Sequence, residues 1–396
     1  MGGAGLRAVE TGLQPAGAGA GAGAGVRAAG TAAVSGAGVR GAGARPGPRR
    51  GKAAWSAWAE LLRVSALFTV PGDALAGAAA AGVRPNRATL LAIGSSLCLY
   101  EAGMALNDWA DRAEDAVDRP HRPIPSGRIS PRAALVASAA LTAAGLGLAA
   151  RAGRPALAVA AGLAATVWSY DLHLKHTAAG PAAMAAARAL DLLLGATATG
   201  GPPSPRPLPS AALLAAHTYA ITAVSRHEAH GGSTRAPLLA LAATLTVAAG
   251  AAGLGTVPRP GTPQGTTGRT SAALPFCARR REAASRVPAP RPHFRDPAVM
   301  PPAPDGDPPT RWPDSLPRLV TAALAVAYAR TPAPAFLHAA LNPSPPLTQR
   351  AVGAGIRALI PLQAALAARS GAPGTAVALL TLAPLARSLA RKVSPT

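Results

Sequence analysis

The chain has 396 residues, of which 49% are hydrophobic and only 14% are charged, so it is too apolar for an ordinary soluble domain and is typical of a multi-span membrane protein. Its net charge of +22 comes almost entirely from arginine. Aromatic residues make up only 3% of the chain, and the arginines lie mostly in loops between apolar segments, which excludes the basic, aromatic face of a nucleic-acid-binding protein. We therefore expect partners among membrane lipids with anionic headgroups, and no nucleic acid.

The first segment, residues 1–53, is a run of Gly and Ala interrupted by Arg. Such a composition lacks the large apolar side chains that would pay for ordering the backbone, so it predicts a disordered basic tail. The run has no leucine-rich stretch of the kind found in a signal peptide.

Apolar segments of about the length of a membrane-crossing helix follow the tail. Several are shorter than the about 20 residues that a crossing helix needs, and many are rich in alanine, which lets helices approach closely. The sequence therefore predicts an all-α, multi-pass transmembrane bundle of about nine spans. The segment at 316–341 contains Pro332 and Pro334, which indicate a broken or partly re-entrant span. The segments are 59–82, 88–108, 133–150, 155–170, 178–198, 210–226, 236–256, 316–341, 349–369 and 373–391.

A long interruption divides the apolar pattern into two parts. Residues 257–315 are rich in Pro, Arg, Gly and Thr and have no helical periodicity, so we expect a disordered insertion without a catalytic role. Residues 54–256 are then the first part of the bundle, and residues 316–396 are its C-terminal part.

Three polar connections, 107–132, 171–177 and 225–235, follow alternate apolar segments, so they are predicted to lie on one side of the membrane. The first has the densest short-loop positive charge in the chain. Because basic loops are retained on the cytoplasmic side, we expect these three loops to face the cytoplasm of a cell-membrane protein.

The first of these connections contains the only dense cluster of carboxylates in the chain. Asn107, Asp111 and Asp115 are spaced four residues apart, and each step drifts by only ~40° around a helix, so the three side chains are predicted to share one face. Like charges at this spacing repel each other, and Mg²⁺ is the natural compensating cation because it binds carboxylate and amide oxygens together with phosphates. The alternative is a solvated acidic helix end.

The other polar groups extend this cluster. Pro123 and Pro125 end the acidic helix and place Arg122 and Ser126 near the carboxylates. The second connection supplies Lys175, which could equally be an anchor that reaches out of the membrane.

Two charged residues lie inside an apolar segment rather than in a loop. Arg188 and Asp191 are three residues apart on one predicted helix face, so they must pair or meet water, and we expect a functional cavity there. The third connection supplies Arg226 and Glu228, and Glu228 is a candidate Mg²⁺ ligand or general base.

The run NDWADRAEDAVDRPHRPIPSG resembles the first aspartate-rich motif of the UbiA superfamily of intramembrane prenyltransferases, in which N-x-x-x-D-x-x-x-D is followed by R-P-x-x-S-G. The segment YDLHLKHT at 170–177 is similar to that family's tyrosine- and lysine-containing loop. The second motif departs from the family's D-x-x-x-D, because only Glu228 offers a carboxylate there. The runs SRHEAHGG and RPIPSGRIS are similar to those of the EboC-like branch of the family. The missing second carboxylate leaves the number of metal ions open.

The resemblance implies a bundle around a central cavity and a Mg²⁺-dependent transfer of a prenyl group from its diphosphate to an aromatic or other small lipophilic acceptor. A prenyl-diphosphate hydrolase or cyclase, and an inactive membrane scaffold, remain as alternatives. The implied metal ligands are Asn107, Asp111, Asp115 and Glu228. The implied catalytic residues are Asn107, Asp111, Asp115, Tyr170 and Lys175, and the implied substrate-binding residues are Arg122, Ser126, Arg188, Asp191 and Arg226.

The expected roles follow from charge and shape. Arg122, Lys175 and Arg226 would neutralise the departing diphosphate, the arginines through bidentate contacts and the lysine as a point charge. Tyr170 would flank the allylic cation with its aromatic face. The apolar bundle would hold the prenyl tail and keep water away from that cation.

Overall fold

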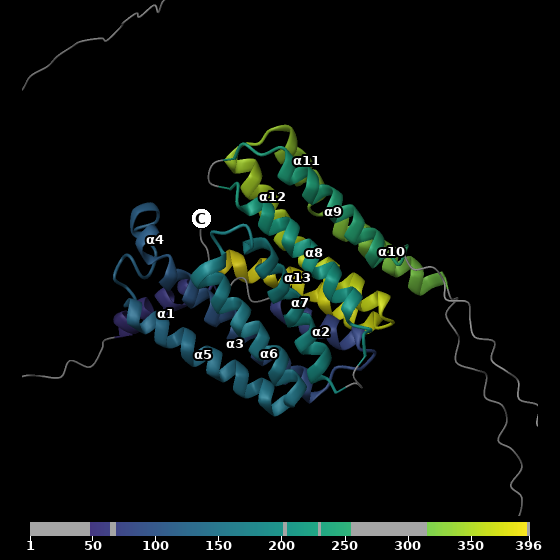
Figure 1. Cartoon of the computed structure of the whole chain (residues 1–396), viewed down its shortest axis with the longest axis horizontal. Coiled ribbons are helices and arrows are strands. Elements are labelled where there is room, and N and C mark those ends of the chain that lie inside the picture. Colours follow the sequence, from purple (N-terminus) through teal and green to yellow (C-terminus); the bar gives the residue numbers. More distant parts are fainter. Residues whose placement is uncertain (1–47, 64–68, 201–203, 229–230, 255–314, 394–396) are drawn as a thin grey trace, which may run out of the picture. The chain divides into compact units, whose positions relative to one another are not determined.

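The computed structural model describes residues 48–63, 69–200, 204–228, 231–254 and 315–393, and within these ranges the chain is helical and contains no β-strand (Figure 1). The predicted basic tail up to residue 47 and the predicted insertion between 257 and 314 lie outside the described residues. The first helices are α1 (Pro48–Leu61), α2 (Val70–Ala80), α3 (Arg87–Ala110), α4 (Arg112–Asp118), α5 (Pro131–Ala152) and α6 (Arg154–Ser169), which continues into a π-helical turn, η2 (Tyr170–Leu174). The later helices are α7 (Gly180–Ala198), α8 (Leu208–Ser225), α9 (Arg235–Ala251), α10 (Ser315–Arg330), α11 (Ala333–Leu341), α12 (Pro345–Arg369) and α13 (Pro373–Val393).

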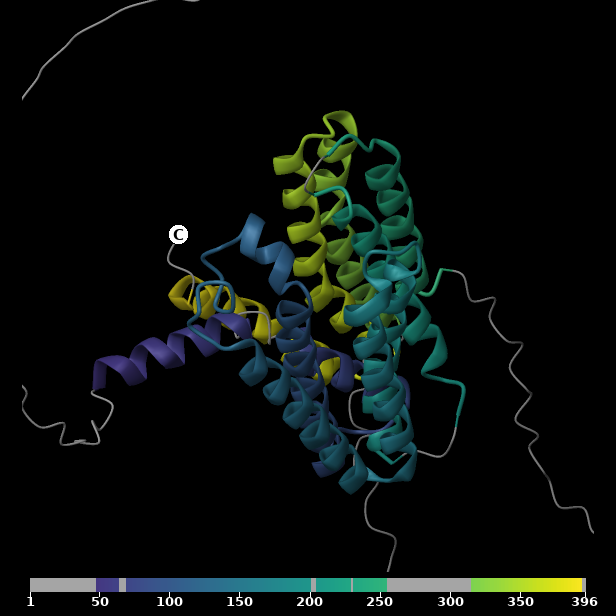
Figure 2. The ribbon, with the colours of Figure 1, turned by 60° about the vertical axis from the view of Figure 1, so that its left-hand side comes forward.

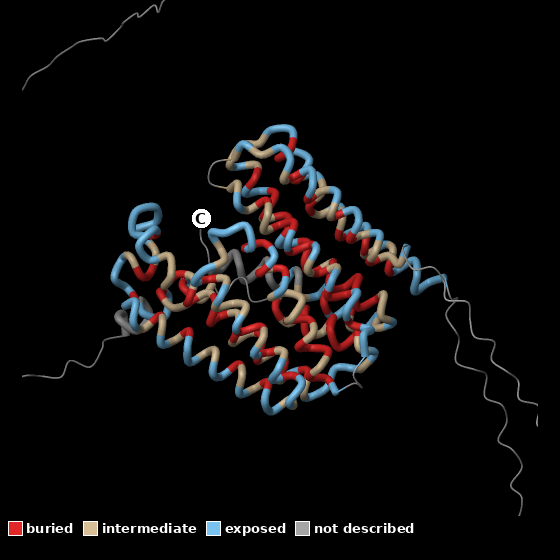
Figure 3. Tube along the Cα trace, viewed as in Figure 1, coloured by how far each residue is buried: buried red, intermediate tan, exposed pale blue. Residues whose placement is uncertain are grey.

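The predicted all-α, multi-pass character is confirmed. In the described part of the chain, α3, α5, α6 with η2, α8 and α12 are long and apolar enough to cross a membrane. The expected number of about nine spans stays a prediction. Large apolar side chains such as Leu90, Val136, Leu239 and Val326 are exposed on the outer faces, as they would be against lipid. Figure 3 shows buried residues along the inner sides of the helices and exposed ones outside.

Prolines explain two of the helix boundaries. The expected single span at 59–82 is wrong, because it is divided between α1 and α2, and Pro71 lies in the first turn of α2, where a proline is tolerated. The break predicted within 316–341 is confirmed, since α10 ends at Arg330 and α11 begins at Ala333 with Pro334 in its first turn. The expected tail is also too long, because α1 begins at Pro48.

Close packing of small residues joins the helices, as the alanine-rich sequence predicts. A Cβ added to Gly195 of α7 would lie 2.3 Å from the backbone of Ala74 in α2, and one added to Gly77 of α2 would lie 2.0 Å from the carbonyl oxygen of Leu192. The backbones of α2 and α7 are therefore in direct contact.

The remaining helices complete the bundle through apolar contacts. Helix α3 packs along α5, α7 packs between α6 and α8, and α12 contacts α2, α8, α10 and α13. Helices α10 and α11 each contact both α9 and α12, and Figure 2 shows the green and yellow-green helices of this part of the chain lying together. In α12, 78% of the apolar stretch is buried, which is the highest share among the candidate spans of the described residues. This helix therefore lies at the centre of the bundle.

Candidate active site

One cavity of about 600 Å³ opens beside the end of α3. Its walls come from α3, α6, η2, α7 and α8, together with the connections that follow α1, α4, η2 and α8. All three polar connections singled out in the sequence reach this cavity. Residues far apart in the chain therefore meet at one place in the folded bundle.

The cavity has a charged part and an apolar part. Six lining side chains are basic: Arg63, Arg119, Arg122, Lys175, Arg188 and Arg226. Four are acidic: Asp111, Asp171, Asp191 and Glu228. The apolar wall includes Leu99, Met104, Leu163, Val167 and Met184. Such a cavity can hold an anionic group against the arginines and lysine and an apolar chain against the wall beside them.

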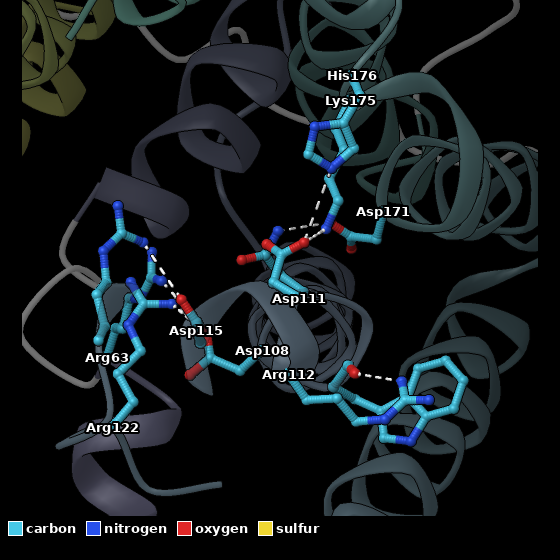
Figure 4. Close-up of polar contacts among 12 residues, drawn as sticks. Arg63, Asp108, Asp111, Arg112, Asp115, Arg122, Asp171, Lys175 and His176 are labelled. Carbon is cyan, nitrogen blue, oxygen red and sulfur yellow. Dashed lines mark hydrogen bonds and ion pairs between the residues drawn. The ribbon is translucent and has the colours of Figure 1, made fainter. Parts of the chain in front are cut away.

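The acidic column is not a continuous helix face, and this corrects the sequence expectation. Helix α3 ends at Ala110, α4 begins at Arg112, and Asp111 lies at the junction. Asp111 pairs with Lys175, and its Oδ1 lies 3.9 Å from Nε2 of His176. Figure 4 shows Asp111 pointing toward these two side chains, whereas Asp115 points toward arginines on the other side.

Asp115 is buried and does not line the cavity. It is 2% exposed, and its oxygens lie 2.7 Å from Nη1 of Arg122 and 3.5 Å from Nη1 of Arg119. The same Arg122 nitrogen lies 3.4 Å from Asp108, which Arg63 reaches at 3.3 Å. Because each carboxylate has its own cation, the repulsion expected of a column of like charges is relieved without stacking the three groups on one face. The expected metal-ligand role of Asp115 stays a prediction.

Asn107 is held by the second connection. Its Nδ2 donates a hydrogen bond of 3.2 Å to Oδ1 of Asp171. The amide nitrogen is thereby occupied, and the amide oxygen is left available as a ligand.

Two neighbours that the sequence interpretation missed complete this group of potential ligands. Ligand atoms of Asp111, Glu114 and His176 all lie within 4.8 Å of one another. Glu114 follows Asp111 by three residues, so helical spacing alone could have indicated it. Carboxylate and amide oxygens are the donors that Mg²⁺ prefers, so this corner of the cavity fits a divalent cation.

Glu228 lines the same cavity from the connection after α8. Burial raises the pKa of its carboxyl group, and the Arg119 guanidinium opposes that shift in part. The charged form of the Glu228 carboxyl group is therefore only partly stabilised.

Ser126 fixes the loop and does not line the cavity. Its hydroxyl donates to the carbonyl oxygen of Arg122 at 2.6 Å and accepts from Nε of Arg128 at 3.0 Å. Arg128 in turn makes a bidentate pair with Glu60, at 2.7 and 3.1 Å. These bonds hold the turn that presents Arg122 to the cavity. The expected substrate contact of Ser126 stays a prediction.

The second and third connections are tied together. Nη1 of Arg226 donates to the carbonyl oxygen of Thr177, and Arg226, Tyr170 and Lys175 all line the cavity. The π-helical turn of η2 places Tyr170 and Lys175 close to each other, since Lys175 N donates to Tyr170 O at 3.0 Å.

A second polar group lies deeper in the bundle. Arg188 and Asp191 line the cavity from α7, as expected, and Ser96 of α3 donates to Oδ1 of Asp191. Nη1 of Arg188 lies 3.0 Å from Oδ2 of Asp73, and Nε2 of Gln363 donates to Oδ1 of Asp73 at 2.7 Å. The sequence interpretation missed Asp73, although it is an acid inside an apolar segment, which is the same signal that indicated Asp191.

Known proteins share sequence with this chain. Residues 65–257 match the model of the UbiA prenyltransferase family. The digeranylgeranylglyceryl phosphate synthase of Methanopyrus kandleri is 39% identical over 114 residues, which cover 29% of this chain and 40% of that protein. The same-named enzyme of Halobacterium salinarum is 35% identical over 168 residues, 42% of this chain and 60% of that protein. A chloroplastic chlorophyll synthase of Oryza sativa is 48% identical over 54 residues, 14% of each chain. The chain thus spans less than two thirds of the length of these relatives.

Solved structures of similar proteins include a digeranylgeranylglyceryl phosphate synthase, with a TM-score of 0.49, 15% identity and coverage of 81% of this chain and 99% of that one. A UbiA homologue from Archaeoglobus fulgidus bound to DMAPP and Mg²⁺ has a TM-score of 0.43 and 21% identity, and covers 49% of this chain and 76% of that one. The EboC-like branch stays a prediction. Residues 65–257, just under half of the chain, thus form a region of the UbiA prenyltransferase family.

Proposed function

We propose that this protein is a Mg²⁺-dependent prenyltransferase, which moves a prenyl group from a prenyl diphosphate to a small lipophilic acceptor at the cytoplasmic side of the membrane. The observation that carries the proposal is the cavity itself, in which basic side chains, carboxylates and an apolar wall lie together. The match of residues 65–257 to the UbiA prenyltransferase family supports the same activity.

The basic residues at the mouth bind and stabilise the diphosphate. Arg119, Arg122, Lys175 and Arg226 line the cavity from three different connections, so they can surround an anionic group. Guanidinium groups make paired, charge-assisted hydrogen bonds to phosphate oxygens, and the Lys175 ammonium acts as a point charge. Negative charge grows on the diphosphate as the C–O bond breaks, so these cations stabilise the transition state more than the ground state.

The carboxylates and one amide would hold the metal. Asp111, with Asn107 and Glu114 beside it, offers oxygen donors at one corner, and Glu228 lines the cavity separately. We keep Asp115 in the predicted ligand set, although in its present position it binds arginines. When bound, Mg²⁺ would neutralise part of the charge on the diphosphate oxygens.

The apolar wall protects the reactive carbon. Leu99, Leu163, Val167 and Met184 exclude water from an allylic cation that would otherwise be hydrolysed. Tyr170 lines the same space and can turn its negative ring face toward that cation.

For the acceptor we propose only a chemical class, a small lipophilic molecule. The archaeal relatives are named for making digeranylgeranylglyceryl phosphate, which suggests an acceptor of the glycerophosphate type. The relative named chlorophyll synthase carries a different acceptor in its name, so the shared stretch does not decide between them.

The proposal is tested by incubating membranes that contain the protein with Mg²⁺ and radiolabelled geranylgeranyl diphosphate, with and without geranylgeranylglyceryl phosphate and a panel of phenols. Label that moves into an acceptor supports the transferase. Label released only as free prenol would instead indicate a hydrolase, and label that stays in the diphosphate would contradict an enzymatic role.

A further inference from the structure

Three side chains form a charged surface at the deep end of the cavity, which we name the polar floor: Ser96 of α3, and Arg188 and Asp191 of α7. Two residues of other helices lie directly behind it, Asp73 of α2 and Gln363 of α12, and both are 0% exposed. Four helices thus converge on one buried polar group that the diphosphate site does not use.

The polar floor is well separated from the diphosphate end. Ser96 precedes Asn107 by eleven residues in the unbroken helix α3, which is about 16 Å along the helix axis at 1.5 Å per residue. Leu99, Gly103 and Met104 line the cavity between the two levels. A group bound at the polar floor therefore belongs to a different part of the bound substrates than the diphosphate.

One donor of the polar floor has no partner among the described residues. Nη1 of Arg188 lies 3.0 Å from Asp73, whereas its Nη2 is buried and makes no hydrogen bond. Leaving a charged donor unpaired in a buried place is unfavourable, so a ligand oxygen at this end of the cavity would be stabilised by it. A prenyl tail cannot satisfy that donor.

The charge of the polar floor selects the kind of ligand. The carboxyl groups of Asp73 and Asp191 interact with each other and with the single guanidinium of Arg188. Two carboxyl groups against one cation give no net positive charge, so an anionic ligand group has no electrostatic reason to bind there. A neutral hydroxyl fits, because its oxygen can accept from Arg188 and its proton can be donated to Asp191.

We propose that the polar floor anchors the acceptor by a neutral hydroxyl group at the end remote from its reacting atom. This inference rests on the proposed function, since it assumes that an acceptor shares the cavity with a prenyl diphosphate. Arg188 and Asp191 contact the hydroxyl, Ser96 orients Asp191, and Asp73 and Gln363 are positioning residues that hold Arg188.

The test uses two probes of similar size that differ in charge at one end, 4-hydroxybenzyl alcohol and 4-hydroxybenzoate. Their binding is titrated by calorimetry to the purified full chain that has been saturated with Mg²⁺ and a non-hydrolysable thio analogue of geranylgeranyl diphosphate. The anchor predicts that the neutral alcohol binds more tightly than the anion.

The chain offers a matched pair of variants. Ser95 and Ser96 are adjacent and buried, but Ser95 donates to the carbonyl oxygen of Gly145 at 2.8 Å and does not line the cavity. Each change to alanine removes one buried hydrogen bond, so their effects on thermal stability should be similar. We expect Ser96→Ala to weaken binding of the alcohol about tenfold, and Ser95→Ala to leave it unchanged.

The isosteric Asp191→Asn variant provides a second readout, in which binding of the alcohol should again be weaker. Equal effects of the two serine variants, or tighter binding of the anion, would overturn the anchor while leaving the proposed function intact. Failure of the native protein to bind the prenyl analogue with Mg²⁺ would contradict both.

Discussion

Replacing Arg122 with methionine is expected to weaken both the fold around α4 and the binding of a prenyl diphosphate, because one guanidinium serves both. Its Nη1 lies 2.7 Å from Asp115 and 3.4 Å from Asp108, and the side chain also lines the cavity. Methionine keeps most of the aliphatic length of arginine and removes the charge, so the variant isolates the electrostatic contribution.

The magnitude follows from what each carboxylate retains. Breaking a fully buried ion pair costs about 3–5 kcal/mol, because one charge is left uncompensated. Asp115 still has Arg119 at 3.5 Å, Asp108 still has Arg63 at 3.3 Å, and Arg122 itself is 21% exposed. We therefore expect a loss of about 1–3 kcal/mol in unfolding free energy. Losing one charge-assisted contact to the diphosphate should weaken its binding by about 10- to 100-fold.

Thermal unfolding in detergent measures the first effect, and titration with geranylgeranyl diphosphate in Mg²⁺ measures the second. Arg112→Met is the matched control, since Arg112 begins α4, the helix that precedes Arg122, is exposed, and packs on Trp109 with its guanidinium 4.6 Å from the ring centroid (Figure 4). The reasoning is refuted if Arg122→Met binds the diphosphate as tightly as Arg112→Met does.

Two further predictions concern acid sensitivity and packing. Burial raises the pKa of Glu228 with only partial opposition from Arg119, so its metal-binding carboxylate form is lost at a higher pH than for an ordinary glutamate. As the pH is lowered, Mg²⁺ affinity should therefore begin to fall at a higher pH than it would with an ordinary glutamate. Glu228→Gln should remove this part of the pH dependence of Mg²⁺ affinity. The same pH dependence in the variant and the native protein would exclude Glu228 as a ligand. Gly195→Ala should destabilise the protein by about 2–3 kcal/mol, because the new Cβ would lie 2.3 Å from backbone atoms of Ala74 that cannot turn aside. Gly147→Ala in α5 meets no atom within 4 Å and should be neutral or slightly stabilising, and equal melting temperatures for the two variants would contradict the close contact of α2 with α7.

Composition and periodicity were sufficient to predict the all-α class and to identify charged residues that lie in apolar surroundings. Arg188 and Asp191 could be singled out because a charged side chain inside an apolar segment needs a partner or water, and both line the cavity. The convergence of the three polar connections followed from their alternation between apolar segments. These arguments depend on local spacing, which the folded chain retains.

Asp115 shows where spacing fails. The expectation that Asp115 lies beside Asp111 assumed an unbroken helix. The helix is interrupted at Asp111, and the Asp115 side chain pairs with Arg122 instead. The partners of Asp73 show a different limit, because Gln363 lies 290 residues away and only the packing of α12 on α2 brings it near. Sequence periodicity identifies such a buried group but cannot name its partner.

The central claim is that a metal at the end of α3 holds the diphosphate, and binding of geranylgeranyl diphosphate to the purified protein with and without Mg²⁺ tests it most directly. The comparison includes Asp111→Asn and, as a matched control, Asp118→Asn, an exposed acid at the end of α4. We predict binding that requires Mg²⁺, falls sharply in Asp111→Asn and is unchanged in Asp118→Asn. Binding that is equal with and without Mg²⁺, or equally strong in both variants, would contradict the account.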